Sequence, residues 1–387
     1  MQNLARNLLD YLTRHQDELL GYLRELVIVE SPSSEPESQK EMFDILAAPL
    51  QEIGYETVHL SGRTSGGQFY ARPKNRKKAV PCQLLLGHAD TVWPLGTLDS
   101  MPFEIEGNTV RGPGVYDMKG GLVQFIWSLR ALHELGLEPS VTPVIFVSSD
   151  EELGSEESRN RIELLARRAN RVYVPEPSAG PTGKLKTSRK GVGVYQITIR
   201  GKSAHAGVEP EAGRSAIFEL SHVIQKLHSF NDSAHGTTVN VGVVEGGTCV
   251  NVIPALCTAE VDVRVSSLSD GTRLDDEIRN VKPVQEGITI EVTGGLDRPP
   301  MEETPRNRAL WNIASKLGLE LGLALEKSHS GGGSDGNLTS PFAATLDGLG
   351  SIGGGAHAPH EFILADALIE RTALLALLIN APALPKK

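Results

Sequence analysis

Histidine and carboxylate side chains gather at five places in this sequence, and most of these places directly follow a short apolar segment. The residues concerned are His88 and Asp90, Asp117, the run Asp150-Glu151-Glu152, Glu176, and His357. Open α/β sheets bind ligands just beyond the carboxyl ends of their strands, so the recurrence suggests one shared site. Two imidazoles and several carboxylates suit a centre that holds two divalent metal ions. The sequence therefore predicts a dinuclear metal site.

Each cluster taken alone also fits a purely structural role. His88 and Asp90 point to the same side of an extended segment, so Asp90 could orient the His88 ring, but a solvated strand end has the same pattern. Asp117 follows a glycine-rich loop and could equally be the N-cap of a helix. The run Asp150-Glu151-Glu152 is also typical of a solvated acidic turn. The feature that favours a metal site over these structural roles is the order of the clusters along the chain.

The glycine-rich segment 331–336 supports a second hypothesis, a serine hydrolase. Gly332-Gly333-Ser334-Asp335-Gly336 matches the nucleophile motif of α/β-hydrolases, and Asp347 and His357 follow in the order that those enzymes use. The motif needs a helix directly after the serine, whereas residues 337–341 have the composition of a turn, so we expect no helix there. The same expectation argues against a dinucleotide site at these glycines. A third hypothesis is a binding protein without catalytic activity. Such a protein would lack a metal ligand or the catalytic base, whereas every one of these positions has a suitable residue in this sequence.

Length and composition exclude several classes of protein. The 387 residues suffice for roughly two to three domains, and the formal net charge of −10 disfavours nucleic acid as a partner. No apolar segment approaches the roughly 18 residues of a membrane helix, and the first residues lack a secretory-signal pattern, so we expect a cytoplasmic protein without a membrane partner. Cys82, Cys249 and Cys257 are not spaced as a thiolate zinc motif, and we expect them to be buried free thiols.

The periodicity of apolar residues predicts the elements that position the clusters. Steps of three and four residues predict helices at 4–27, 42–53, 120–135, 213–227, 309–317 and 365–378. Short β-branched segments predict strands at 82–86 and 144–147, and period-two strands follow from Gly191 onward, at 192–199, 238–244 and 259–265. We therefore expect an α/β catalytic domain, residues 1–190 and 299–387, with a mixed sheet and helices on both faces. Residues 191–298 are expected to form a smaller inserted α+β domain.

The motifs together resemble those of the zinc-dependent aminoacylase and carboxypeptidase family, and the resemblance covers nearly the whole chain. The motifs that carry it are GHADTV, GPGVYDMKGG, SSDEELGS, EPSAG, GKSAHAGVEPEAG and GGGSDGN, in this order. The family includes glutamate carboxypeptidases, acetylornithine deacetylases and succinyl-diaminopimelate desuccinylases, and the motifs are most similar to those of the glutamate carboxypeptidases. The inserted domain then corresponds to a lid and dimerisation domain.

The resemblance implies a role for each residue of the metal centre. Asp117 corresponds to the ligand that bridges two zinc ions, His88 and Glu176 to ligands of one ion, and Glu152 and His357 to ligands of the other. Glu151 corresponds to the general base. Asp90 is expected to belong to the catalytic site as the carboxylate that orients His88, because a metal-bound imidazole usually gives its other N–H to a carboxylate. The resemblance also implies a cis peptide bond between Asp117 and Met118. His357 fits the family pattern better than His360, and Co²⁺ or Mn²⁺ are expected to substitute for Zn²⁺.

The resemblance further implies the substrate class and the assembly. His205 corresponds to a catalytic histidine that a homodimer supplies to the active site of the neighbouring subunit. Residues expected to bind substrate are Asn251, Arg264, Arg298, Gly332 and Gly333. The implied reaction is hydrolysis of an amide bond next to a free carboxylate in a peptide or N-acyl amino acid. Release of a C-terminal amino acid is the first expectation, and N-acyl amino acid deacylation is the alternative.

Overall fold

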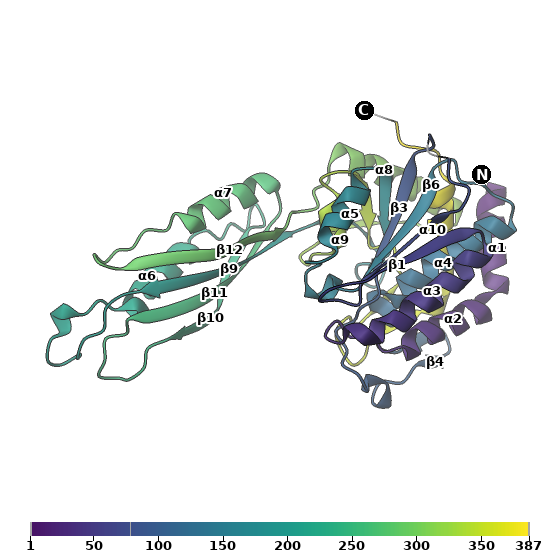
Figure 1. Cartoon of the computed structure of the whole chain (residues 1–387). Helices are drawn as coiled ribbons and strands as arrows, with labels where there is room; N and C mark the ends of the chain where they lie inside the picture. Colours follow the sequence, from purple (N-terminus) through teal and green to yellow (C-terminus); the bar gives the residue numbers. More distant parts are fainter. Residues whose placement is uncertain (1, 78, 386–387) are drawn as a thin grey trace. The chain divides into compact units, whose positions relative to one another are not determined.

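The computed structural model describes residues 2–77 and 79–385, which divide into two compact units (Figure 1). The first unit contains the chain up to Ser188, Glu303–Ser330 and the chain from Ser334 onward. The second unit contains Arg189–Glu302 together with Gly331–Gly333. The second unit is therefore inserted into the sequence of the first.

An eight-stranded mixed sheet forms the centre of the first unit, with the strand order β1-β2-β6-β3-β7-β14-β8-β13. The four neighbours β6, β3, β7 and β14 run parallel, whereas β2 is antiparallel to both of its neighbours, β6 and β1. In chain order the strands are β1 (Tyr55–Leu60), β2 (Gln68–Pro73), β3 (Cys82–His88), β6 (Thr142–Ser148), β7 (Ala169–Val174), β8 (Leu185–Arg189), β13 (Lys327–Ser330) and β14 (Ala344–Asp347).

Helices cover both faces of this sheet, because its central strands are apolar along their whole length. Every residue of β3 and β6 is buried. Since side chains alternate between the two faces of a strand, Leu85 and Ile145 enter one core and Leu84 and Val144 the other. The helices are α1 (Gln2–Arg14), α2 (Gln16–Ile28), α3 (Lys40–Glu52), α4 (Gly120–Glu134), α5 (Arg159–Ala166), α8 (Pro305–Glu320), α9 (Asp335–Thr339) and α10 (Ala365–Asn380). The predicted fold class is confirmed.

Three local predictions were wrong. The segment predicted as one helix at 4–27 forms two, because His15 leaves helical geometry (φ −106°, ψ 20°) and its Nδ1 lies 2.8 Å from the carbonyl oxygen of Tyr11. A helix, α9, does follow Ser334, whose hydroxyl accepts a hydrogen bond from Gly336 N as an N-cap. Cys82 and Cys257 are buried as expected, but Cys249 is exposed.

A small antiparallel sheet with the order β15-β16-β5-β4 lies in the first unit and joins two segments that are distant in sequence. Its strands are β4 (Glu104–Glu106), β5 (Thr109–Arg111), β15 (Gly353–Gly354) and β16 (Phe362–Leu364). The pairing of β16 with β5 brings the loop after β5 close to the loop between β15 and β16. These two loops carry Asp117 and His357.

The second unit is an antiparallel sheet with two helices on one face (Figure 1). The strand order is β10-β11-β9-β12, and alternate residues of β9, such as Ile197 and Ile199, pack against α6 and α7. The elements are β9 (Gly191–Arg200), α6 (Ala216–His228), β10 (Thr238–Gly246), β11 (Leu256–Val265), α7 (Leu268–Arg279) and β12 (Thr289–Arg298). In the part of the chain that the structure describes, no helix has the length and apolar character needed to cross a membrane.

Helix α4 approaches the end of β7 closely because its first turn contains glycine. A Cβ atom on Gly121 would lie 2.2 Å from the carbonyl oxygen of Pro175. That oxygen belongs to the backbone directly before Glu176, so the close approach helps to fix the position of the Glu176 segment.

We expect Gly121→Ala to lower the free energy of unfolding by about 1–3 kcal/mol, because the added methyl group clashes with fixed backbone. Gly21→Ala is the matched control, since Gly21 lies in a helix and has nothing within 4 Å of its Cβ position. The control should be neutral or stabilising by up to about 1 kcal/mol, as alanine favours helix. Urea unfolding followed by circular dichroism measures both, and equal effects of the two substitutions would contradict this account.

Candidate metal centre

The carboxyl ends of three adjacent parallel strands carry most of the predicted site residues. β6, β3 and β7 are neighbours in the sheet and point the same way, so the residues that follow them share one edge. His88 is the last residue of β3, the run Asp150-Glu151-Glu152 follows β6, and Glu176 follows β7. The parallel pairing therefore places residues that are 24 to 88 positions apart in the sequence at a common edge.

Asp117 reaches this edge from the turn Val115–Lys119, which connects β5 to α4. Within the turn, Asp117 (φ −119°, ψ 99°) and Met118 depart from helical geometry, and the peptide bond between them is cis, as predicted. The turn begins at Gly114, whose φ of 74° is in the left-handed region that favours glycine. A Cβ atom at Gly114 would also lie 2.8 Å from Thr91 Cγ2.

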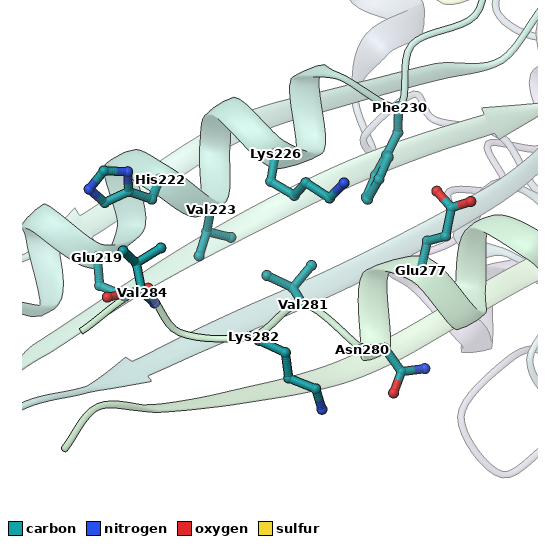
Figure 2. A pocket seen from close by; sticks show the side chains of 10 residues that line it. All are labelled: Glu219, His222, Val223, Lys226, Phe230, Glu277, Asn280, Val281, Lys282 and Val284. Carbon is teal, nitrogen blue, oxygen red and sulfur yellow. Dashed lines mark hydrogen bonds between the residues drawn. The ribbon is translucent and has the colours of Figure 1, made fainter. Parts of the chain in front are cut away.

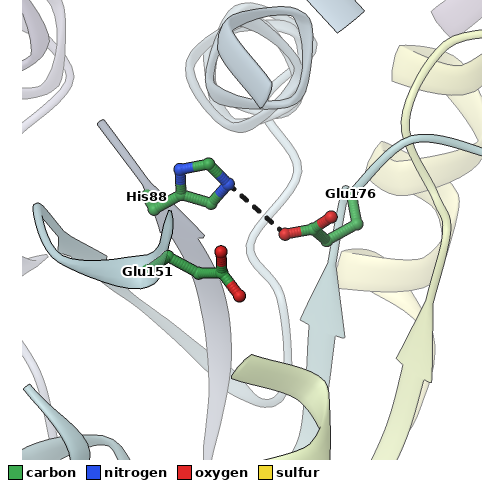
Figure 3. Close-up of side chains that lie close together, drawn as sticks. All are labelled: His88, Glu151 and Glu176. Carbon is green, nitrogen blue, oxygen red and sulfur yellow. Dashed lines mark ion pairs between the residues drawn. The ribbon is translucent and has the colours of Figure 1, made fainter. Parts of the chain in front are cut away.

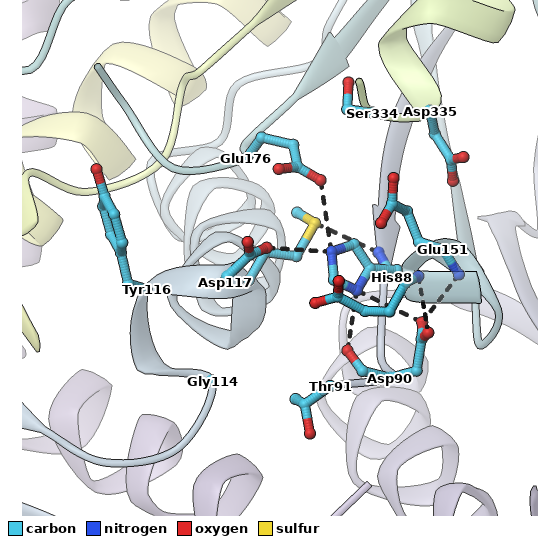
Figure 4. A network of polar contacts seen from close by, with 12 residues as sticks. His88, Asp90, Thr91, Gly114, Tyr116, Asp117, Glu151, Glu176, Ser334 and Asp335 are labelled. Atoms are coloured by element: carbon cyan, nitrogen blue, oxygen red, sulfur yellow. Dashed lines mark hydrogen bonds and ion pairs between the residues drawn. The ribbon is translucent and has the colours of Figure 1, made fainter. Parts of the chain in front are cut away.

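The two histidines contact opposite oxygens of the Asp117 carboxylate (Figure 4 shows the His88 half of this arrangement). His88 Nε2 lies 3.3 Å from Asp117 Oδ1 and 3.4 Å from Glu176 Oε1. His357 Nε2 lies 3.5 Å from Asp117 Oδ2 and 3.2 Å from Glu152 Oε2. Two imidazole–carboxylate pairs thus share one aspartate, and each pair has the nitrogen and oxygen donors that a divalent metal ion accepts.

Incompletely paired oxygens and raised pKa values indicate that this cluster suits cations. Glu152 Oε1 is buried without a hydrogen-bond partner among the described residues, and the buried Asp117 Oδ1 has only the 3.3 Å contact with His88 Nε2. Hydrogen bonds to Asp117 and Glu152 raise the pKa of His357 to about 10. Burial opposes protonation of His88, but hydrogen bonds to Asp117, Asp90 and Glu176 raise its pKa well above the usual value. Carboxylates this dense require positive charge, which metal ions can provide in place of these protons.

Glu151 lies beside the half of the cluster that contains His88 (Figure 3). Its carboxylate, His88 and Glu176 each contribute one atom to a group whose members lie within 4.8 Å of one another. His88, Asp117 and Glu152 form a second such group. Glu151 is therefore close enough either to ligate a metal ion or to exchange a proton with a group bound between the ligands.

Asp90 connects the loop after β3 to the loop after β6. Its carboxylate accepts hydrogen bonds from Glu151 N (3.3 Å), Glu152 N (3.1 Å) and Ser33 Oγ (2.8 Å). The His88 ring contacts the backbone carbonyl of Asp90 through Nδ1 at 2.9 Å, whereas the carboxylate oxygen Oδ1 is 3.4 Å away. Asp90 thus positions the two glutamates as well as the histidine, a role that the two-residue spacing did not reveal. Sequence reasoning also missed Ser33, whose surroundings in the sequence carry no distinctive signal.

The catalytic and substrate-binding residues predicted in the second unit fall into two groups at opposite ends of its sheet. The backbone of the His205 loop pairs with the Asn251 segment, where Ala206 N donates to Asn251 O at 3.0 Å. At the other end, Arg264 and Arg298 both lie opposite Val192 in the strand register. The ends of β9 at Val192 and Arg200 are roughly 26 Å apart, since a strand rises about 3.3 Å per residue.

The second of these groups includes the glycine-rich segment. A Cβ atom on Gly333 would lie 3.2 Å from Arg298 Cδ, and Gly332 O accepts a hydrogen bond from Arg189 at 3.2 Å. Arg264 is held by Asp262, with Nε 2.9 Å and Nη2 2.8 Å from the carboxylate oxygens. The sequence-predicted residues Arg264, Arg298 and Gly333 therefore lie near one end of the unit.

Ser334 does not have the surroundings of a nucleophile. Its side chain is fully buried, caps α9, and donates to the Asp347 carboxylate at 2.5 Å. A serine nucleophile must be exposed and adjacent to a histidine base, whereas His357 contacts Asp117 and Glu152. The hypothesis of a serine hydrolase is therefore wrong, although the helix whose expected absence spoke against it is present. His360 is exposed, and it is His357 that joins the cluster.

A groove of about 600 Å³ lies in the second unit, between α6 and the segment after α7 (Figure 2). Apolar residues such as Val223 and Val281 line it together with side chains of both charges, including Lys226 and Glu277. None of its lining residues belongs to the imidazole–carboxylate cluster, and it lacks the convergent donors of a hydrolytic centre.

Comparison with known proteins gives consistent matches over nearly the whole chain. A model described as a peptidase dimerisation domain matches residues 187–282. Carboxypeptidase G2 of Pseudomonas sp. (strain RS-16) is 29% identical over 380 residues, which cover 95% of this chain and 90% of the relative. A succinyl-diaminopimelate desuccinylase of Aromatoleum aromaticum is 27% identical over 363 residues, covering 88% of this chain and 91% of the relative.

Solved structures share the fold at lower sequence identity. An aminopeptidase from Bacillus cereus has a TM-score of 0.77 at 23% identity and covers 94% of this chain and 98% of its own. An M20 family metallo-carboxypeptidase from Sulfolobus solfataricus has a TM-score of 0.70 at 16% identity, with coverage of 94% and 98%. The match to a peptidase dimerisation domain, the relatives that span nearly the whole chain and the shared fold agree with one another: the chain is similar to M20 peptidases, which are hydrolases.

Proposed function

We propose that this protein is a dinuclear zinc hydrolase that cleaves an amide bond next to a free carboxylate. The observation that carries the proposal is the Asp117 carboxylate, whose two oxygens each face a separate imidazole–carboxylate pair. His88 and Glu176 would hold one ion, Glu152 and His357 the other, and Asp117 both. A dinuclear metal-binding peptidase of the M20 family from Bacillus subtilis, with a TM-score of 0.71 at 17% identity and coverage of 95% and 98%, has the same fold. Co²⁺ or Mn²⁺ would fit the same donors.

The protein's own residues supply the proton transfers in this proposal. A zinc pair, when bound, polarises the scissile carbonyl and lowers the pKa of the attacking water. The Glu151 carboxylate accepts the proton of that water and then returns it to the nitrogen of the leaving amine. Asp90 accepts hydrogen bonds from the backbone amides of Glu151 and Glu152, and so fixes the positions of the base, Glu151, and of the adjacent ligand, Glu152.

Two classes of substrate fit this chemistry. The carboxypeptidase relative favours release of a C-terminal amino acid, and the desuccinylase relative favours removal of an acyl group from an amino acid. Both substrates present an amide and a carboxylate. Arg264 and Arg298 are suited to the carboxylate because a guanidinium group binds it in a bidentate manner. We place C-terminal amino acid release first and N-acyl amino acid deacylation second.

Removal of metal should abolish hydrolysis, and zinc should restore it. The test assays zinc-loaded, chelator-treated and zinc-reconstituted protein on a panel of dipeptides, acylglutamates and N-acyl amino acids. A serine-reactive inhibitor is the control, and it should have no effect because Ser334 is buried. Hydrolysis that survives complete removal of metal would refute the proposal, and the preferred panel member identifies the substrate class.

Glu151→Gln and Glu152→Gln should separate the base from the ligand. We expect Glu151→Gln to abolish turnover with both zinc ions retained, because the amide cannot accept the proton. Glu152→Gln should lose zinc as well as activity, because it removes an anionic oxygen that faces His357. Elemental analysis of the two purified variants measures the zinc, and loss of zinc from the Glu151 variant would make Glu151 a ligand instead.

We also propose that the second unit forms a homodimer. β10 is an edge strand of the sheet, and its Val243 and Val244 side chains are about half exposed. Ile217 and Phe218 on the neighbouring helix α6 are similarly exposed. An apolar edge of this kind favours pairing with another strand, and a second copy of the chain supplies an identical edge. The match to a peptidase dimerisation domain supports this choice of partner.

The distribution of the predicted substrate residues supports a catalytic role for the dimer. His205 and Asn251 lie at one end of the sheet, and Arg264 and Arg298 at the other. A separation of roughly 26 Å is too large for both groups to contact one small substrate. We infer that His205 of each subunit serves the active site of the other, where it donates to the developing oxyanion.

Mixing two inactive variants tests this arrangement. His205→Ala should lower activity about 10²-fold or more without changing zinc content, as expected for the loss of an oxyanion donor. After subunit exchange with the Glu151→Gln variant, each heterodimer has one complete site, and random exchange in a two-fold dimer should restore about a quarter of wild-type activity. Confirmed exchange without recovered activity, or a monomeric protein in solution, would contradict the inference.

A further inference from the structure

Glu361 is a buried carboxylate close to the imidazole–carboxylate cluster, and among the described residues it forms no hydrogen bond with the predicted ligand side chains. It is 1% exposed and accepts four hydrogen bonds from N–H groups. Its Oε1 accepts from Tyr116 N (2.8 Å) and Asp117 N (3.1 Å). Its Oε2 accepts from Gly114 N (2.9 Å) and Trp93 Nε1 (2.9 Å). A buried charge of this kind is costly unless it is fully hydrogen-bonded, so all four donors are held in place with it.

The four donors come from two of the loops that carry the predicted ligands. Trp93 lies on the loop that continues from His88 and Asp90, and the three backbone donors belong to the turn that carries Asp117. Glu361 itself lies four residues after His357. One carboxylate therefore ties together the chain segments of both histidines and of the aspartate that they share.

Tyr116 extends this connection to a third ligand segment. Its backbone N–H donates to Glu361, and its hydroxyl donates to the carbonyl oxygen of Ser178. Ser178 lies two residues after Glu176, and Ser178 Oγ in turn donates to Ser351 O at 2.8 Å. The position of the Glu176 segment thus depends on the same turn that Glu361 holds.

We propose that Glu361 is a positioning residue that holds Asp117, His357 and, through Tyr116, Glu176 at the separations needed to bind two metal ions. This inference rests on the proposed dinuclear function and adds a residue to it. Glu361 acts through the backbone of the ligands, so its effect should be on metal affinity and on kcat rather than on KM.

Glu361→Gln tests the proposal because it keeps the size of the side chain. Each carboxylate oxygen accepts two N–H donors, so the NH₂ group of glutamine would face two of them and force the turn apart. We expect zinc affinity, titrated against a chromophoric chelator, to fall about 10–100-fold, with a changed absorption spectrum of the Co²⁺-loaded protein. In excess zinc, kcat should fall while KM stays close to the wild-type value.

Glu219→Gln is the matched control. Glu219 is also fully buried and accepts backbone hydrogen bonds from Val284 N and Gln285 N, but it lies in the second unit. This variant should lose stability without a change in zinc affinity. If both variants bind two zinc ions as tightly as wild type, the proposal for Glu361 is wrong. If the wild-type protein itself binds fewer than two ions, the proposed dinuclear function is wrong instead.

A second pair of variants decides the question if Glu361→Gln does not fold. Tyr116→Phe removes the hydroxyl that holds the Ser178 carbonyl, and Tyr173→Phe removes a comparable buried bond, from Tyr173 Oη to Leu378 O at 2.9 Å. Zinc affinity should fall in the Tyr116 variant and remain unchanged in the Tyr173 variant. Equal zinc affinities in these two variants would overturn the proposal.

Discussion

Repulsion among carboxylates held within a few ångströms is the constraint on which the first unit depends. Asp117, Glu152 and Glu176 converge on two imidazoles at 3.2 to 3.5 Å, and Glu151 is beside them. Like charges at such distances would separate if the chain were free to move. The rest of the unit must therefore supply rigidity, and cations must supply the compensating charge.

Rigidity comes from two sources. The strands that end at the cluster are buried on both faces, so their ends cannot shift without disturbing two cores. The loops beyond the strands are held by two buried carboxylates, Asp90 and Glu361, which accept hydrogen bonds chiefly from backbone amides, although Asp90 Oδ1 also lies 3.4 Å from the His88 ring. The carboxylates of Asp90 and Glu361 thus add negative charge beside the cluster, and N–H groups stabilise that charge by hydrogen bonds. The buried oxygens of Asp117 and Glu152, which lack well-formed hydrogen bonds, are the atoms that bound metal ions would satisfy.

The residues of the second unit that are proposed to act on the substrate fall into two separate groups. Its sheet places Arg264 and Arg298 at one end and His205 with Asn251 at the other. A single copy of the unit cannot bring both ends to one small molecule, whereas two copies related by symmetry can. The proposed dimer and the proposed catalytic role of His205 are therefore linked, because the length of β9 keeps the two groups of residues apart within one copy.

The sequence by itself determined the fold class, the strands at 82–86 and 144–147, and the set of residues that meet in the cluster. The fold class and the strands follow from apolar periodicity, which reports burial, and the polar clusters follow from their places after strands, whereas the choice of His357 over His360 rests on the family resemblance. It could not show the break at His15, the helix after Ser334 or the exposure of Cys249, which depend on local competition for hydrogen bonds and on packing. Only the tertiary structure decided that Asp90 binds the amides of Glu151 and Glu152, and that Glu361 binds the turn around Asp117. Those bonds join residues about 60 and about 245 positions apart, and no periodicity encodes a contact between one side chain and the backbone of a distant turn.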